Sequence, residues 1–130
     1  MDRQALIDRL LDHYDQPRNH GAMADADVQI HGGNPDCGDE VTIYLKIDAA
    51  SGRVARISFE GRGCTISQAA ASLLSELFAG AELGAISSYD EQALIDYLGR
   101  EVVQARPRCA TLALGTLKTA VLRYRQTAGS

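Results

Sequence analysis

The fold is decided by one stretch of the sequence: VTIYLKI at residues 41–47, the turn AASG at residues 49–52 and ARISFE at residues 55–60. Apolar and polar side chains alternate in both longer runs, which is the period of a strand with one buried face. The two runs therefore predict a β-hairpin. Val28 and Ile30 alternate with polar neighbours just before it, so we expect a third strand in a meander.

Helical patterns precede and follow these strands. Apolar residues over 3–14 fall at helical spacing and predict a first helix. After Gly63 the period becomes helical, and a broad apolar stripe predicts a second helix that crosses the sheet. A third helix is expected to begin at Ser88 as its N-cap, after a loop over residues 81–88, and a last one at Cys109. The order α-β-β-β-α-α-α indicates an α+β fold, a small three-stranded antiparallel sheet with helices packed on one face.

Local expectations accompany these helices. The apolar face of the first helix includes Leu11 and Tyr14, with His13 in a surface or packing role rather than as a metal ligand. Gly115, inside the last helix, costs about 1 kcal/mol relative to alanine, which suggests close packing at that point.

The composition indicates one soluble globular domain over residues 1–130. The formal net charge of -4 argues against nucleic acid as a partner. No apolar run reaches the length of a membrane span, so no membrane association is expected. The chain opens directly on an amphipathic, acid-containing pattern, so we expect neither a signal nor a transit peptide and a cytoplasmic location.

The chain has 3 cysteines, an odd number in a compartment where thiols stay reduced, so a disulfide framework is a poor account of them. Cys37 lies with Asp39 in the turn-rich loop GGNPDCGD at residues 32–39. Cys64 follows Gly-Arg-Gly where the period changes, and Cys109 follows Arg-Pro-Arg. Each thiol thus lies at a junction between elements, where glycine or proline is expected to leave it exposed and where side chains from separate parts of the chain can meet.

Thiols at the start of a helix ionise more easily than free ones, because the helix N-terminus favours negative charge. Three thiolates beside the Asp39 carboxylate need a cation. Three sulfurs and one oxygen suit tetrahedral Zn(II), and thiolates equally suit an iron-sulfur cluster. The cysteines lack the paired C-x-x-C spacing of zinc fingers. We therefore expect a site at the edge of the fold, whose metal is exchangeable and not needed for folding.

A family resemblance follows from these motifs. NPDCGD at residues 34–39, FEGRGCTIS at 59–67 and RCATL at 108–112 resemble the three cysteine motifs of U-type iron-sulfur cluster assembly proteins, the family of IscU, SufU and the NifU N-terminal domain. HY at residues 13–14, with PRN at 17–19, resembles the end of that family's first helix.

The resemblance implies a scaffold or sulfur acceptor that takes persulfide sulfur from a cysteine desulfurase. It then assembles a [2Fe-2S] cluster or relays the sulfur to downstream iron-sulfur assembly proteins or apo-protein acceptors. The implied ligands of Zn(II) or a [2Fe-2S] cluster, at the same site, are Cys37, Asp39, Cys64 and Cys109. The activity implied is sulfur acceptance of a zinc-dependent sulfurtransferase type rather than independent catalysis.

Two departures bear on the sub-branch. Arg108 stands where the housekeeping branch has a histidine, and residues 102–107 lack that branch's Leu-Pro-Pro-Val-Lys type of stretch. Both favour the SUF-type branch, although the segment between Cys64 and Cys109 is shorter than is usual there.

For the mechanism we expect Cys37 as first persulfide acceptor and Cys109 as second. Asp39 is a weak ligand for a soft-metal site and is the one expected to leave first. Arg62 and Arg108 are expected to offset the negative charge of the site.

Other interpretations remain open at this point. Cys64 with His13 or His31 as base would describe a cysteine-nucleophile enzyme. A structural zinc-binding domain would explain the ligands without sulfur transfer, and it predicts that chelation unfolds the chain. Asp39 would also serve simply as the cap of a turn.

Overall fold

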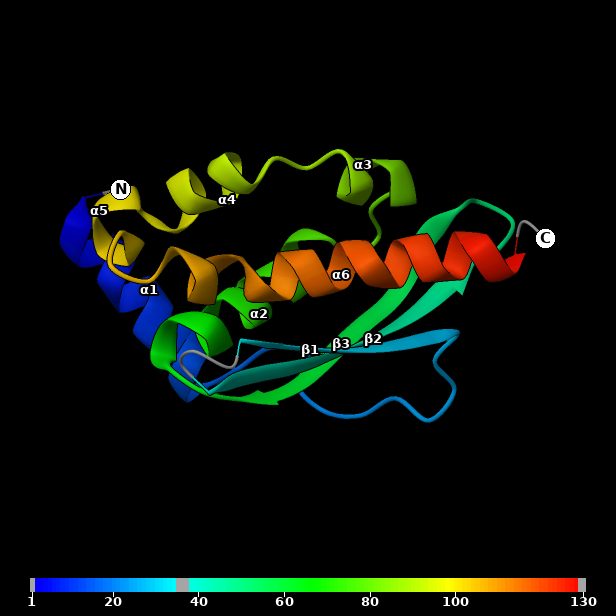
Figure 1. Ribbon diagram of the computed structural model, residues 1–130, viewed down its shortest axis with the longest axis horizontal. Coiled ribbons are helices and arrows are strands. Elements are labelled where there is room, and N and C mark those ends of the chain that lie inside the picture. Colours follow the sequence, from blue (N-terminus) through cyan, green and yellow to red (C-terminus); the bar gives the residue numbers. More distant parts are fainter. Residues whose placement is uncertain (1, 35–37, 129–130) are drawn as a thin grey trace.

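A computed structural model of the protein describes residues 2–34 and 38–128. The chain order is α1 (Arg3–Asp15), β1 (Val28–Asn34), β2 (Asp39–Asp48), β3 (Arg53–Arg62), α2 (Thr65–Leu77), α3 (Leu83–Ser87), α4 (Glu91–Leu98), α5 (Arg100–Val103) and α6 (Pro107–Ala128). The three strands lie on one side of the molecule and the helices on the other, as Figure 1 shows. The predicted α+β class, with its antiparallel sheet and helices on one face, is confirmed.

The sheet is a meander with the strand order β1-β2-β3. Ile30 pairs with Ile43, and Ile43 pairs with Phe59, so one row of buried apolar side chains crosses all three strands. The segment after α1 runs along the outer edge of β3: the Gly21 N–H donates to the Phe59 carbonyl at 2.8 Å, and the Phe59 N–H to the Asn19 carbonyl at 3.1 Å. These bonds satisfy polar groups that a bare edge would expose.

The last helix, α6, is the longest and packs across β1, β2 and α2. Its residues Leu114, Leu117 and Val121 are fully buried, as are Leu45 and Phe59 on the facing sheet. This apolar core lies between the sheet and the helices, and its main cluster of buried residues includes neither Cys64 nor Cys109. Over the described residues, none of the helices combines the length and the hydropathy that a membrane span needs.

The connections between the helices differ from expectation. The predicted loop over residues 81–88 contains the short helix α3, and Ser88 ends that helix rather than beginning the next one. The N-cap of α4 is Asp90, whose carboxylate accepts the Gln92 N–H at 3.1 Å. Gly99, at φ +106°, separates α4 from α5.

The buried face of α1 also differs. Leu11 and Tyr14 are 46% and 43% exposed, whereas Leu10 and His13 are buried. His13 Nδ1 and Ser72 Oγ of α2 lie 2.7 Å apart, and Ser72 Oγ also accepts the backbone N–H of Arg18 at 2.8 Å. The buried face of α1 therefore includes the hydrogen-bonded His13, while Leu11 and Tyr14, which the apolar pattern placed on that face, are exposed.

The buried His13 predicts a pH-dependent stability. Desolvation, followed by the charge of Arg18, lowers the His13 pKa from its ordinary value of 6.5 and outweighs Glu76 and Asp12. The folded state thus binds fewer protons than the unfolded state, and its stability falls as pH drops below the ordinary histidine pKa. Urea unfolding from about pH 7.5 to about pH 5 should show this loss, and His13→Gln should flatten it. An equal pH slope in the variant would contradict the assignment.

Two glycines predict opposite effects. A Cβ at Gly115 meets no described atom within 4 Å, so the close packing expected there is wrong; at Gly32 a Cβ would lie 2.1 Å from Thr116 Oγ1. We expect Gly115→Ala to raise the free energy of unfolding by about 0.5–1 kcal/mol through helix propensity. Gly32→Ala should lower it by about 1–3 kcal/mol, because the Thr116 side chain must give up its position and its hydrogen bond to the Leu112 carbonyl, or α6 must shift. Denaturant melts measure the free energy of unfolding of both variants. A Gly32→Ala variant more stable than the wild type would contradict the close contact between Gly32 and Thr116.

Candidate metal centre

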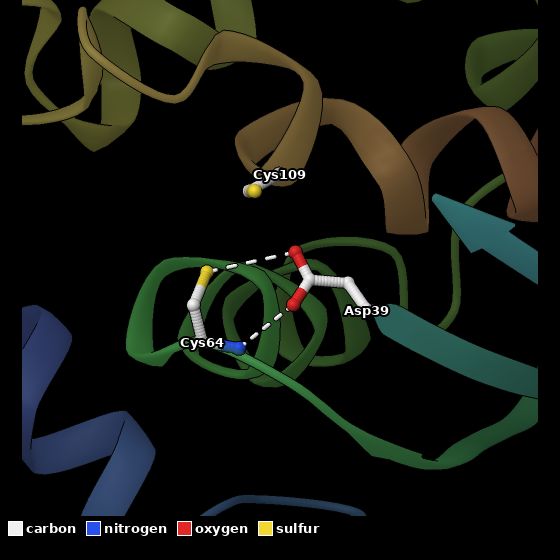
Figure 2. Close-up of side chains that lie close together, drawn as sticks. All are labelled: Asp39, Cys64 and Cys109. Atoms are coloured by element: carbon white, nitrogen blue, oxygen red, sulfur yellow. Dashed lines mark hydrogen bonds between the residues drawn. The ribbon is translucent and has the colours of Figure 1, made fainter. Parts of the chain in front are cut away.

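Three elements that are distant in the sequence begin at the same place. Asp39 is the first residue of β2, Cys64 is the N-cap of α2, and Cys109 lies in the first turn of α6. One ligand atom from each side chain lies within 4.8 Å of the others. Figure 2 shows the two sulfurs and the carboxylate facing one another. The structure thus brings together three of the four predicted ligands, while Cys37 lies outside the described residues.

The Asp39 carboxylate is fixed by the backbone of the next motif. Its side chain is 1% exposed, and Oδ1 accepts the Cys64 N–H at 2.8 Å. Gly63 is required beside it, because a Cβ there would lie 2.1 Å from Oδ1 and the residue has φ +143°. Asp39 therefore caps the backbone at the start of α2, not the strand or turn that follows it in the sequence, while its second oxygen still faces the sulfurs.

The two described thiols differ in exposure. Cys64 is half-buried, and its Sγ accepts the Ser67 N–H at 3.5 Å and lies 3.6 Å from Asp39 Oδ2. Cys109 is 3% exposed, although its Arg-Pro-Arg context suggested an accessible thiol. Cys64 is thus the more accessible of these two sulfurs to a partner.

An arginine that the sequence interpretation missed lies at both sulfurs. The guanidinium of Arg106 interacts with Cys64 and Cys109; the negative charge of Cys64, and then the hydrogen bond to Cys109, raise the Arg106 pKa above its ordinary value. The Arg106 carbonyl accepts the Ala110 N–H at 3.1 Å as α6 begins. The available signal was its position three residues before Cys109, because residues three apart share a side of a helical turn.

Arg62, expected beside the site, instead pairs with Glu40 at 2.5 Å and is 81% exposed, so its assignment as a charge-balancing residue is not supported. The expectation for Arg108 stays a prediction. His13 is engaged with α2, with Nε2 3.4 Å from Glu76. His31 contacts Thr42 at 3.2 Å and Glu40 at 3.7 Å.

The chemistry of the donor set fits a soft metal. Among the described residues, the cluster of metal-capable side chains is Asp39, Cys64 and Cys109. Two sulfurs and one carboxylate oxygen from separate elements can hold Zn(II) or an iron-sulfur cluster, and a fourth donor would complete a tetrahedral site. Thiolates at these positions, beside the buried Asp39 carboxylate, would make a cation favourable here.

Two substitutions of Asp39 separate its roles. Asp39→Asn keeps an oxygen to accept the Cys64 N–H, so the free energy of unfolding of the metal-free protein should change by less than about 1 kcal/mol. Its zinc affinity should fall at least about tenfold, because an amide is a poorer ligand than a carboxylate. Asp39→Ala should lose zinc affinity and about 1–3 kcal/mol of stability, because a buried N–H loses its acceptor. Metal-free melts and chelator competition measure both quantities, and equal stability of the two variants would refute the capping role.

Comparisons with known proteins match this arrangement. The family model described as the NifU-like N-terminal domain matches residues 6–130. The chain is 32% identical over 117 residues to iron-sulfur cluster assembly scaffold protein IscU 1 of Archaeoglobus fulgidus, covering 90% of this chain and 74% of that protein. It is 32% identical over 133 residues to the zinc-dependent sulfurtransferase SufU of Bacillus subtilis, covering 88% and 87%.

A solved structure agrees with these sequence relatives. The crystal structure of an iron-sulfur cluster assembly scaffold protein for the SUF system from Fervidobacterium islandicum superimposes with a TM-score of 0.73 and 26% identity, covering 92% of this chain and 99% of that one. The family model spans nearly the whole sequence, and the structure brings together one ligand residue from each of the three motifs. The chain belongs to the NifU-like N-terminal domain family of iron-sulfur cluster assembly proteins.

Proposed function

We propose that the protein accepts persulfide sulfur from a cysteine desulfurase and assembles it, or relays it, for [2Fe-2S] cluster formation. Cys37, Asp39, Cys64 and Cys109 are the proposed ligands of Zn(II) or of the cluster at one shared site. The observation that carries the proposal is the convergence of Asp39, Cys64 and Cys109 within 4.8 Å from three separate elements. Membership of the family supports it. Downstream assembly proteins or apo-proteins would receive the product, in a cytoplasmic setting where thiols stay reduced.

Relatives from the scaffold branch and from the SUF-type branch support a single site that can hold either a cluster or Zn(II). A scaffold IscU and a zinc-dependent SufU are equally similar to this chain, at 32% identity. Thiolates serve both, since they bind Zn(II) and iron-sulfur clusters alike. A bound metal would supply charge compensation and hold the thiols deprotonated. The proposed activity is sulfur acceptance rather than independent turnover of a substrate.

The sulfur-transfer step needs an ionised and accessible thiolate. In this step a thiolate of the protein attacks the outer sulfur of the desulfurase persulfide, forming a new S–S bond, while the old S–S bond breaks and the desulfurase cysteine leaves as a thiolate. The charge balances, and no external oxidant is required. We propose Cys37 as the first acceptor and Cys109 as the second; at 3% exposure, Cys109 accepts sulfur only after its surroundings open.

The fixed position of Asp39 changes one part of the expected mechanism. The sequence led us to expect Asp39 to leave first and open a ligand position. Oδ1, however, is held by the Cys64 N–H at 2.8 Å, and the side chain is buried. We propose that Asp39 stays in place throughout, and that changes at the site take place among the thiolates.

The other interpretations receive less support. His13 contacts Ser72 and Glu76, and His31 contacts Thr42 and Glu40. These contacts do not place either histidine as a base beside Cys64 in the described part of the chain. A structural zinc role fits less well, because the main apolar cluster between the sheet and the helices includes neither Cys64 nor Cys109. These arguments leave the sulfur acceptor as the best supported function.

Chelation separates the acceptor from a structural zinc domain. After anaerobic purification we expect about one zinc ion, or one [2Fe-2S] cluster, per chain. Removal of the metal should leave the far-ultraviolet circular dichroism spectrum unchanged, because the core lies elsewhere, while stimulation of a cysteine desulfurase is lost and returns with zinc. Protein kept at the same chelator concentration with excess zinc is the control. Unfolding on chelation would favour the structural role, and full stimulation without metal would refute the zinc-dependent proposal.

A further inference from the structure

The two edges of the sheet differ in how the chain covers them. Residues 19–21 bond to Phe59 on the outer edge of β3, and the Val54 N–H donates to the Ala81 carbonyl at 2.8 Å on the same edge. At the other side of the sheet, β1 pairs with β2 and, over the described residues, with no further strand. Alternate N–H and C=O groups of an edge strand point away from its neighbour. The outer edge of β1 therefore presents hydrogen-bonding groups to a further strand.

β1 lacks the features that protect edge strands from pairing. Its sequence VQIHGGN has neither lysine nor proline, and its register with β2 runs from Val28 to Asn34 without a shift. Lysine, proline and bulges are the usual features that keep an edge strand from pairing with another chain. Its 7 residues, at about 3.4 Å each, make an edge about 24 Å long. An extended chain is therefore the occupant whose backbone complements this edge.

A groove beside this edge is lined by small residues. It has a volume of about 270 Å³ and lies between β1 and α6, where Gly32, Thr111, Gly115 and Thr119 are among its lining residues. A Cβ at Gly115 would meet no described atom within 4 Å, so packing inside one copy does not account for a residue that lowers helix stability. The approach of a second chain would account for it, because glycine lets another backbone come close.

The same side of α6 continues beyond the groove. Thr111, Gly115, Thr119 and Leu122 follow one another at spacings of three or four residues, so they share one side of the helix. Leu122 is 58% exposed, more than any other large apolar side chain in the part of the chain that the structure describes. A single extended peptide would pair with β1 but would bring no helix to this side of α6. A second copy of the chain would bring both elements.

The strand edge and the helix side share a centre. His31 is the middle residue of β1, Gly115 is the middle residue between Thr111 and Thr119, and both line the same groove. A two-fold axis at this point would place each of them opposite its own counterpart and would pair the whole of β1 antiparallel. Because α6 packs on both β1 and β2, the two copies of α6 would face each other at Gly115. Small residues permit the axis distance of about 8–10 Å that such helices need.

Charge and contact area are also compatible with a second copy. β1 contains no Asp, Glu, Lys or Arg, so pairing it with itself brings no fixed like charges together. A strip one strand and one helix wide, along an edge of about 24 Å, buries roughly 700–1,000 Å² in total. That area is at the lower end for specific interfaces, which indicates a weak dimer rather than a permanent one.

We propose that the outer edge of β1 and the side of α6 centred on Gly115 form a homodimer interface, in which the β1 strands of two copies pair antiparallel about His31. The two three-stranded sheets then form one continuous sheet. An interface of this kind needs a surface that is complementary to itself. None of the proposed metal ligands lies in β1 or on this side of α6, so the inference does not rest on the proposed function.

Disulfide crosslinking tests the register. Opposed Cα atoms in an antiparallel pair lie about 4.5–5.5 Å apart, which is within the range of a disulfide. We expect His31→Cys to give a covalent dimer on a non-reducing gel after oxidation with copper phenanthroline. Gln29→Cys is the matched control, because it is exposed on the same strand and its counterpart would lie about 14 Å away. The wild type under the same treatment measures crosslinking through the native cysteines.

Sedimentation equilibrium tests the helix side. We expect the wild type to change from monomer to dimer as its concentration rises through the micromolar range. Gly115→Lys should raise the dimer Kd at least about tenfold, because two unpaired charges would meet at the axis. Lysine has a higher helix propensity than glycine, so loss of the dimer in this variant would not come from unfolding. Ala93→Lys, at an exposed position of α4, adds the same charge elsewhere and should change the Kd by less than about twofold.

Three outcomes would overturn the inference. The first is a wild type that stays monomeric at its highest soluble concentration, which would leave the edge of β1 to a strand of another protein. The second is a dimer that keeps its affinity in Gly115→Lys and gives no crosslink in His31→Cys. The third is a dimer that dissociates when a chelator is added, because it would be held together by metal. The crosslinking and sedimentation of metal-free protein involve neither zinc nor sulfur transfer, so failure here leaves the proposed function standing.

Discussion

The hydrogen bond from the Cys64 N–H to Asp39 Oδ1, at 2.8 Å, is the constraint on which the site depends. It joins the first residue of β2 to the N-cap of α2, across 25 positions of sequence. The bond forms only because Gly63 has no side chain where a Cβ would meet Oδ1. With the start of α2 fixed to the sheet, α6 packs across both and brings Cys109 to the same point. One peptide N–H and one glycine thus fix Cys64 beside Asp39, and the packing of α6 adds Cys109.

A metal-loaded site would gather the charges of the Asp39 carboxylate and the thiolates in one place. Asp39 and Cys109 are buried, and anions in such a place are costly unless a cation is near. Functional sites commonly carry an unfavourable local arrangement that the surrounding structure over-determines. Here the apolar layer between the sheet and α6 provides stability, away from the cysteines. The separation of core from site lets metal and sulfur be exchanged while the fold persists.

Much of the fold could be predicted from local patterns, because strands and helices have distinct periods. Alternation over residues 41–47 and 55–60 indicated the hairpin, and the period change after Gly63 located α2. Patterns failed where tertiary contacts decide. Leu11, predicted on the buried face, is exposed, and His13 is buried instead, because Ser72 of α2 supplies a polar partner that the pattern of α1 does not reveal. Similarly, Cys109 is buried because α6 packs on α2, which no junction motif indicates.

For the site, the sequence located the ligands better than their surroundings. Cysteines at element junctions are recognisable because glycine and proline mark those junctions. Arg106 was not recognised as a neighbour of the sulfurs, because Arg62, Arg106 and Arg108 all lie close to a cysteine in the sequence. The main chain of Arg106 is fixed by hydrogen bonds with Val103 and Ala110, and its exposed side chain interacts with Cys64 and Cys109. Which arginine lies near the thiols thus depends on the backbone geometry at the start of α6, and the sequence pattern does not reveal that geometry.

Asp39 shows how a weak ligand differs from a loosely attached one. A carboxylate oxygen binds a soft metal less strongly than a thiolate does, which is a property of the oxygen atom itself. How firmly the carboxylate is held depends instead on its protein neighbours: Oδ1 accepts a peptide N–H, and Oδ2 lies 3.6 Å from the Cys64 sulfur. Both oxygens therefore have partners without metal, so the buried carboxylate pays little of the penalty of a bare charge. Because both oxygens of Asp39 already have partners, the side chain gains no hydrogen bond by moving away from the site. The metal can therefore leave and return without a change in the position of Asp39.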